Sequence, residues 1–111
     1  MKKLGIIDHN AGNLFSLENA LKMLNVKYII TNKKKLLDEC SHLILPGVGA
    51  FSPAMKSLKK NKLDKFLIKA ASKNKPILGI CLGMQMLFEI SSEFGSHKGL
   101  SLIKGVVKKI N

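Results

Sequence analysis

Short apolar segments alternate along the whole sequence with segments of helical periodicity, and this alternation limits the chain to few folds. Apolar runs of strand length occur at Leu4–Asp8, Val26–Thr31, His42–Leu45 and Pro76–Ile80. Between the first two, Leu14–Leu24 has leucines at i, i+3, i+7 and i+10, which predicts one buried helix face. Strands separated by helices form right-handed crossovers and a parallel sheet. We therefore predict an α/β fold: an open, mostly parallel sheet with helices on both faces.

The remaining segments are predicted to belong to the same domain. A chain of 111 residues is one domain at most, or part of one, and residues 1–111 contain no linker or repeat. Ser52 and Pro53 predict a helix start, as N-cap and first helical residue. We expect a turn over Asn32–Lys35, helices over Leu36–Cys40, from Ser52 to about Lys60, over Leu63–Ser72 and over Leu82–Ile90, a loop over Glu93–Gly99 and a strand over Val106–Ile110.

Lysine alone produces the net charge of +12, since all 19 basic residues are lysines and none is arginine. Arginine is the preferred reader of phosphate and guanine, because its planar fork forms paired hydrogen bonds. With one tyrosine and no tryptophan, stacking platforms for single strands are also scarce. We expect the lysines to cover solvated faces and expect no nucleic acid as partner.

Membrane insertion and metal binding lack their usual sequence signals. No apolar run approaches the roughly 20 residues that cross a bilayer, and Asp8 interrupts the first run, so we expect no signal peptide. The two cysteines, Cys40 and Cys81, form no C-x-x-C motif, and the three histidines are scattered. We therefore expect a cytoplasmic chain with reduced cysteines, no metal, no cofactor and no membrane partner.

The carboxyl ends of the predicted strands are the expected location of the functional site. Open parallel sheets bind their ligands in the crevice beyond these ends. Three segments reach this edge: the loop His9–Asn13, the loop Pro46–Phe51 and the turn around Cys81. The site should lie where they meet.

Cys81 occupies the centre of a G-x-C-x-G motif, Gly79-Ile80-Cys81-Leu82-Gly83, between a predicted strand and a predicted helix. This is the cysteine counterpart of the nucleophile elbow G-x-S-x-G, in which flanking glycines let strand and helix approach while the central side chain stands exposed. A position at a helix N-terminus also favours the thiolate form. The alternative is a buried cysteine beside two turn glycines, which is common in proteins. The order strand, elbow and helix favours the nucleophile.

A second glycine-rich segment, Pro46-Gly47-Val48-Gly49-Ala50-Phe51, directly follows the third predicted strand. Such a segment can direct backbone N–H groups at a developing oxyanion, and the residue after the nucleophile, Leu82, would supply another donor. Two alternatives are a plain turn and a dinucleotide fingerprint. The fingerprint lacks its third glycine, and no acidic residue ends a following strand at the usual spacing of about 20 residues, which argues against NAD.

These segments together resemble a known family. The matching residues are Asp8, Gly12-Asn13, Leu45 to Phe51, Pro76 to Gln85, Leu87-Phe88-Glu89, Gly99 to Ile103 and Gly105. In this order, and over nearly the whole chain, they resemble the glutaminase subunit of imidazole glycerol phosphate synthase, a class I (triad) glutamine amidotransferase. The resemblance implies the flavodoxin-like fold of those amidotransferases.

The resemblance also implies an activity and roles for residues. Cys81 would attack the glutamine side-chain amide, forming a thioester and releasing ammonia. Ammonia would pass to a synthase (cyclase) subunit, bound as heterodimer partner, which makes imidazole glycerol phosphate and AICAR in histidine biosynthesis. The resemblance implies that Val48 or Gly49 forms the oxyanion hole together with Leu82. It implies that Gly49, Gln85 and Glu93 bind glutamine. It also implies that Gly12 and Asn13 face the partner.

Without the resemblance, Gln85 is an ordinary polar helix position and Glu93 a solvated loop acid. His9, where related sequences usually have tyrosine, is expected to be a loop residue near the partner surface. Cys40 and His42 are expected to be structural.

A general base for Cys81 is missing from the sequence. In the family the base and its orienting acid form a His-x-Glu segment well downstream, whereas His97 here is followed by Lys98 and Gly99. The chain thus resembles the N-terminal part of a single class I amidotransferase domain, truncated before the triad is complete. We expect little or no glutaminase activity from it alone, uncovered apolar faces and a tendency to aggregate.

Two other functions stay open at this point. One is a sister amidotransferase that supplies ammonia to a surface-sugar (lipopolysaccharide or nonulosonate) synthase. The other is a non-enzymatic cysteine-elbow protein, against which Gln85 and the segment Pro46–Phe51 argue, because such a protein needs no glutamine site.

Overall fold

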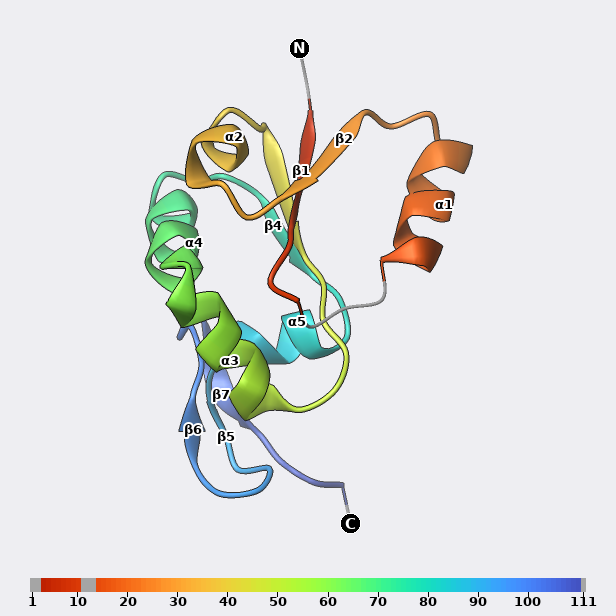
Figure 1. Ribbon diagram of the computed structural model, residues 1–111. Helices are drawn as coiled ribbons and strands as arrows, with labels where there is room; N and C mark the ends of the chain where they lie inside the picture. Colours follow the sequence, from red (N-terminus) through yellow and green to blue (C-terminus); the bar gives the residue numbers. More distant parts are fainter. Residues whose placement is uncertain (1–2, 11–13, 111) are drawn as a thin grey trace.

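The computed structural model describes residues 3–10 and 14–110, and its main element is a parallel sheet with helices on both faces (Figure 1). The sheet has four strands in the order β2-β1-β3-β4, and every neighbouring pair is parallel. This is the strand order of flavodoxin-like doubly wound sheets, and the predicted fold class is confirmed. The strands are β1 (Leu4–Ile7), β2 (Tyr28–Thr31), β3 (His42–Leu45) and β4 (Ile77–Gly79).

Helices pack on the two faces of the sheet. Helix α1 covers one face, where its Leu21 packs with Ile6 and Ile44, and the other face is covered by α2, α3 and α4 (Figure 1). The last helix, α5, follows β4 directly. The helices are α1 (Phe15–Met23), α2 (Lys34–Asp38), α3 (Phe51–Lys60), α4 (Leu63–Ser72) and α5 (Leu82–Met86).

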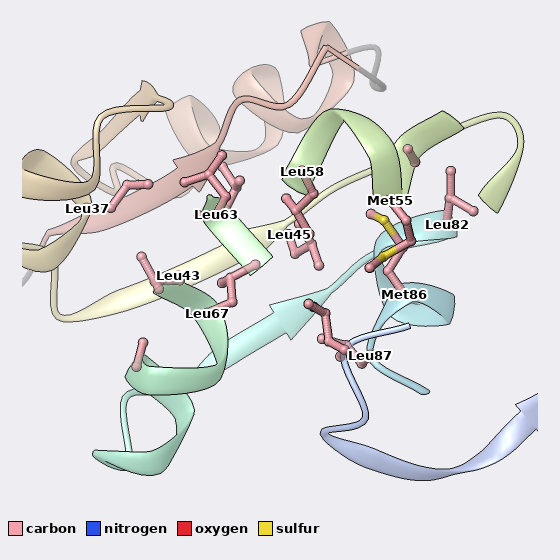
Figure 2. Close-up of a cluster of buried hydrophobic side chains, with 14 of the residues drawn as sticks. Leu37, Leu43, Leu45, Met55, Leu58, Leu63, Leu67, Leu82, Met86 and Leu87 are labelled. Carbon is pink, nitrogen blue, oxygen red and sulfur yellow. The ribbon is translucent and has the colours of Figure 1, made fainter. Parts of the chain in front are cut away.

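The main core lies between the sheet and α2, α3, α4 and α5, and it consists largely of leucine and methionine (Figure 2). Leu43 and Leu45 of β3 face Leu58 of α3 and Leu67 of α4, all within 1 % of complete burial. The periodicity of α3 and α4 explains this arrangement, because their apolar residues fall on one stripe. β3 is therefore the strand against which the helices are fixed.

A second, three-stranded sheet was not predicted from the sequence. Its order is β6-β5-β7, with β5 (Phe88–Ser91) parallel to β7 (Ile103–Val107) and antiparallel to β6 (His97–Lys98). It lies beyond the carboxyl end of the large sheet (Figure 1).

Three sequence predictions in this region were therefore wrong. The helix expected over Leu82–Ile90 ends at Met86, the loop expected over Glu93–Gly99 contains β6, and the strand expected over Val106–Ile110 is Ile103–Val107. The helix stops because the carbonyl groups of Met86 and Leu87 accept hydrogen bonds from later residues. Leu100 donates to Met86 at 2.8 Å, and Leu102 donates to Leu87 at 2.8 Å. These acceptors are thus unavailable to the next helical turn.

The other element boundaries differ from prediction by small amounts. Helix α2 begins at Lys34, within the expected turn, and α3 begins at Phe51 with Ala50 as its N-cap. Pro53 consequently stands at the third helical position instead of the first. Phe51 itself is buried at 1 % exposure, so packing of its ring extends the helix by one residue.

The α1 face of the sheet leaves apolar side chains uncovered, as expected. An apolar groove runs beside α1, and Leu78 on the edge strand β4 is 57 % exposed. Within residues 3–10 and 14–110, the helices are all too short to cross a membrane.

Adjacent positions on α4 provide a test of the core. Leu67 is fully buried, whereas its neighbour Ile68 is 44 % exposed. We expect Leu67→Ala to lower the free energy of unfolding by about 2–5 kcal/mol, because it removes transfer energy and leaves a cavity. Ile68→Ala, the matched control, should change it by less than about 1 kcal/mol. Urea denaturation of both variants measures this, and equal effects would contradict the assigned core.

Candidate active site

Cys81 stands on a strained turn between β4 and α5. Its backbone has φ 55° and ψ −122°, a combination that residues with a side chain rarely adopt, and its side chain is exposed. Cys40 is the contrasting case, since it is 2 % exposed and its Sγ donates to the carbonyl oxygen of Leu36. Burial raises the pKa of the Cys40 thiol, against the lowering effect of Lys3 and Lys75. Only Cys81 is therefore presented as a nucleophile.

The two glycines of the motif are required by close backbone contacts. A Cβ atom on Gly83 would lie 1.8 Å from the carbonyl oxygen of Leu45, and one on Gly79 would lie 2.6 Å from the Cα of Met84. Any side chain at either position would force β3, β4 and α5 apart. The expected close approach of strand and helix at the elbow is confirmed.

The glycine-rich segment after β3 lies directly beside the elbow. Ile80 N–H donates to Leu45 O at 3.0 Å, and Leu82 N–H donates to Gly47 O at 3.1 Å. Val48 is 54 % exposed, and Gly49 has φ +97° with open space where a side chain would begin. The N–H group of Leu82, which we expected to serve as an oxyanion donor, therefore donates to Gly47 O in this structure.

Cys81 opens into a hollow of about 430 Å³ at the carboxyl edge of the sheet. The expected meeting of the loop after β3 with the elbow is seen here, because Pro46, Gly47 and Val48 line the same hollow as Cys81. Ser16 and Leu17 of α1 line it too, which sequence reasoning missed. The sequence position of these two residues could have indicated this, since α1 begins just after the loop at the end of β1.

Four of the other predicted residues are described by the structure and are not among those that line this hollow: Gly49, Leu82, Gln85 and Glu93. Gln85 is on α5, one turn after Cys81 and half-buried, and Glu93 is exposed beyond β5. Gly12 and Asn13 lie outside the described residues. Among the residues that the structure describes, no group of three or more His, Cys, Asp or Glu is arranged to hold a metal ion.

His9 is placed differently from our expectation. It belongs to the loop after β1, but its side chain is only 2 % exposed and contacts Pro46, so it is not a surface residue. His42 lies at the opposite end of the sheet, with Nδ1 2.8 Å from Ser41 Oγ, and the ring of His97 bonds the Phe94 carbonyl. Of the side chains described, no histidine therefore reaches the hollow at Cys81.

Comparison with known proteins agrees with this geometry. The family model of the CobB/CobQ-like glutamine amidotransferase domain matches residues 3–109. The chain belongs to this amidotransferase family. A crystal structure titled as a glutamine amidotransferase superposes with a TM-score of 0.80 at 21 % identity, covering 95 % of this chain and 55 % of that one, which supports the amidotransferase fold.

Two relatives of similar sequence carry the same name. Imidazole glycerol phosphate synthase subunit HisH of Bacillus velezensis is 47 % identical over 102 residues, covering 92 % of this chain and 48 % of the relative. The protein of the same name from Prochlorococcus marinus (strain SARG) is 50 % identical over 107 residues, covering 96 % and 50 %. The chain thus spans about half the length of the relatives it matches.

Gly83 allows a direct test of the elbow. We expect Gly83→Ala to lower the free energy of unfolding by about 1–3 kcal/mol or more, because the added methyl group meets backbone that cannot move aside. Met84→Ala, at the next and 43 % exposed position, should stay within about 0.5 kcal/mol of the parent. Urea midpoints compare the two, and a fully stable Gly83→Ala chain would contradict the packing described here.

Proposed function

We propose that this chain carries the nucleophile half of a glutaminase, the ammonia-producing subunit of imidazole glycerol phosphate synthase in histidine biosynthesis. The main support for this proposal is that Cys81 is exposed on a strained elbow beside the segment Pro46–Gly49. The matched HisH proteins, which carry the name of that synthase, support this branch. The partner would be the cyclase subunit, in a cytoplasmic heterodimer.

The proposed reaction uses the Cys81 thiol together with nearby backbone donors. Cys81 Sγ attacks the amide carbon of glutamine, and an S–C bond forms while the carbonyl oxygen takes up negative charge. Backbone N–H groups of Val48 or Gly49 and of Leu82 would stabilise this oxyanion. The C–N bond then breaks, ammonia leaves with the thiol proton, and a glutamyl thioester remains. Water hydrolyses the thioester to glutamate and restores the thiol.

Glutamine would be recognised by its amino-acid head, which distinguishes it from other amides. Gln85 and Glu93 are our candidates for this contact, together with Gly49. Gln85 lies on α5, the helix whose N-cap is Cys81, so α5 fixes its distance from the nucleophile.

The proton transfers need a base that Cys81 lacks here. Among the described residues, none of His9, His42 and His97 lines the hollow at Cys81. The ring of His9 bonds the Pro46 carbonyl, and the rings of His42 and His97 bond Ser41 and Phe94. The family's His-x-Glu segment would have to supply the base. The described residues therefore hold and orient the substrate and provide the nucleophile, without driving turnover.

Affinity labelling tests the nucleophile. A chloroketone analogue of glutamine should modify Cys81, and Cys81→Ala should abolish the labelling. Cys40→Ala is the matched control, and it should label like the parent because Cys40 is buried. Peptide mapping by mass spectrometry identifies the site. Labelling at Cys40 instead of Cys81, or labelling of Cys81 that excess glutamine does not slow, would contradict the proposal.

Turnover by the 111-residue chain is the second test. We expect it to release glutamate from glutamine at a rate at least about 1,000-fold below that of an amidotransferase of ordinary activity, because the general base is missing. A coupled glutamate assay with Cys81→Ala as background measures this. Normal turnover by the chain alone would show that the base lies within it.

A further inference from the structure

His9 is a buried histidine that the proposed chemistry does not use. It is 2 % exposed, and its Nε2 lies 2.5 Å from the carbonyl oxygen of Pro46, which is 37 positions later in the sequence. Pro46 is the first residue of the segment that faces Cys81. A side chain from the end of β1 is therefore in contact with the segment at the end of β3.

The acceptor of this contact defines which ring nitrogen carries a hydrogen. A carbonyl oxygen can only accept, so Nε2 carries the hydrogen and donates it. In the neutral ring Nδ1 is then the acceptor nitrogen, and it has no hydrogen-bond partner among the residues that the structure describes. One hydrogen bond thus holds the ring, and that bond is the one to Pro46.

The backbone of His9 is itself fixed by a hydrogen bond, so the ring of His9 can hold Pro46 in place. The hydroxyl group of Ser57 on α3 donates to the His9 carbonyl oxygen. α3 begins at Phe51, the last residue of the glycine-rich segment. The loop after β1, the segment after β3 and the helix that follows are consequently joined through one residue.

The segment Pro46–Gly49 has a particular need for such support. In the strand order β2-β1-β3-β4, the chain leaves β1 toward one side and β3 toward the other, which opens a crevice at the carboxyl edge between them. Two consecutive carbonyl groups of the segment accept hydrogen bonds from residues that follow β1 and β4, the two strands beside β3. Pro46 O accepts from His9 after β1, and Gly47 O accepts from Leu82 after β4.

We propose that His9 is a positioning residue: its Nε2–H holds the Pro46 carbonyl and so fixes the conformation in which Val48 and Gly49 present their backbone to Cys81. This rests on the proposed function for the meaning of the conformation, but not for the hydrogen bond itself. Without the donor, the buried Pro46 carbonyl group has to find another partner, and the segment has to move to reach one.

Two substitutions separate the hydrogen bond from the volume of the ring. His9→Gln places an amide N–H near the position of Nε2, whereas His9→Leu fills the space without a donor. Since the ring makes one side-chain hydrogen bond in the described structure, glutamine can replace all of it.

The test compares two reagents on Cys81 of the 111-residue chain. When the thiol adds to the ketone carbon of the glutamine chloroketone, the ketone oxygen gains negative charge before chloride is displaced from the neighbouring carbon; iodoacetamide reacts by displacement of iodide alone. The ratio of the two rate constants therefore cancels changes in thiol reactivity and reports the oxyanion donors together with binding of the analogue, and the same ratio in His9→Gln is the reference for binding. We expect His9→Leu to lower this ratio roughly 10- to 100-fold, and His9→Gln to stay within about 3-fold of the parent. An unchanged ratio in His9→Leu, or equal losses in both variants, would overturn the proposal.

Nuclear magnetic resonance distinguishes this outcome from a failure of the proposed function. If the parent chain shows no preference for the glutamine analogue over iodoacetamide, the proposed function fails. The backbone amide signals of Val48 and Gly49 then test whether His9 positions the segment. Shifts in His9→Leu but not in His9→Gln support positioning, and unshifted signals in both overturn it. If His9→Leu does not fold, the ¹⁵N spectrum of the His9 ring in the parent decides: a proton on Nε2 supports the proposal, and a proton on Nδ1 alone overturns it.

Discussion

Two backbone hydrogen bonds join the elbow to the end of β3, and the rest of the candidate site depends on them. Ile80 donates to Leu45 and Leu82 donates to Gly47, at 3.0 and 3.1 Å, so the bonds lie on either side of Cys81. The strained backbone of Cys81 is thus held between two fixed points. This spacing is possible only because Gly83 has no side chain beside Leu45 O. The glycines of the motif are required by packing before they are required by chemistry.

The large sheet and the elbow could be predicted because their signals are local. β1 to β4 are short apolar runs, α1 and α4 have leucines on one stripe, and each needs only its own residues to be recognised. Parallel topology then follows from the alternation, and it brings all carboxyl ends to one edge. Cys81 and the segment after Leu45 each directly follow a strand, so their positions in the sequence are enough to assign both to the same edge.

The features that sequence reasoning missed depend on partners distant in the sequence. The residues after Met86 continue an apolar pattern that suits a helix. Backbone hydrogen bonds from residues 99–103, such as those from Leu100 to Met86 and from Leu102 to Leu87, divert them into β5. His9 is similar, because its partner Pro46 lies 37 positions away and no local pattern marks it. At β5, tertiary hydrogen bonds override the local helix propensity, and at His9 a tertiary hydrogen bond determines where the side chain lies. Predictions from local sequence commonly fail for this reason.

The proposed oxyanion hole raises a physical question about Leu82, whose N–H already donates to Gly47 O. The carbonyl group of bound glutamine is a neutral acceptor like Gly47 O. Exchanging Gly47 O for this carbonyl as the partner of Leu82 N–H therefore gains little free energy in the ground state. The negative oxygen of the tetrahedral intermediate is a stronger acceptor, since hydrogen bonds to a charged partner are roughly twice as strong. Leu82 would therefore transfer its hydrogen bond as charge develops, which favours the transition state over bound glutamine. Holding Pro46 in place through His9 would confine that exchange to the Gly47 carbonyl, leaving the start of the segment fixed while its donors act.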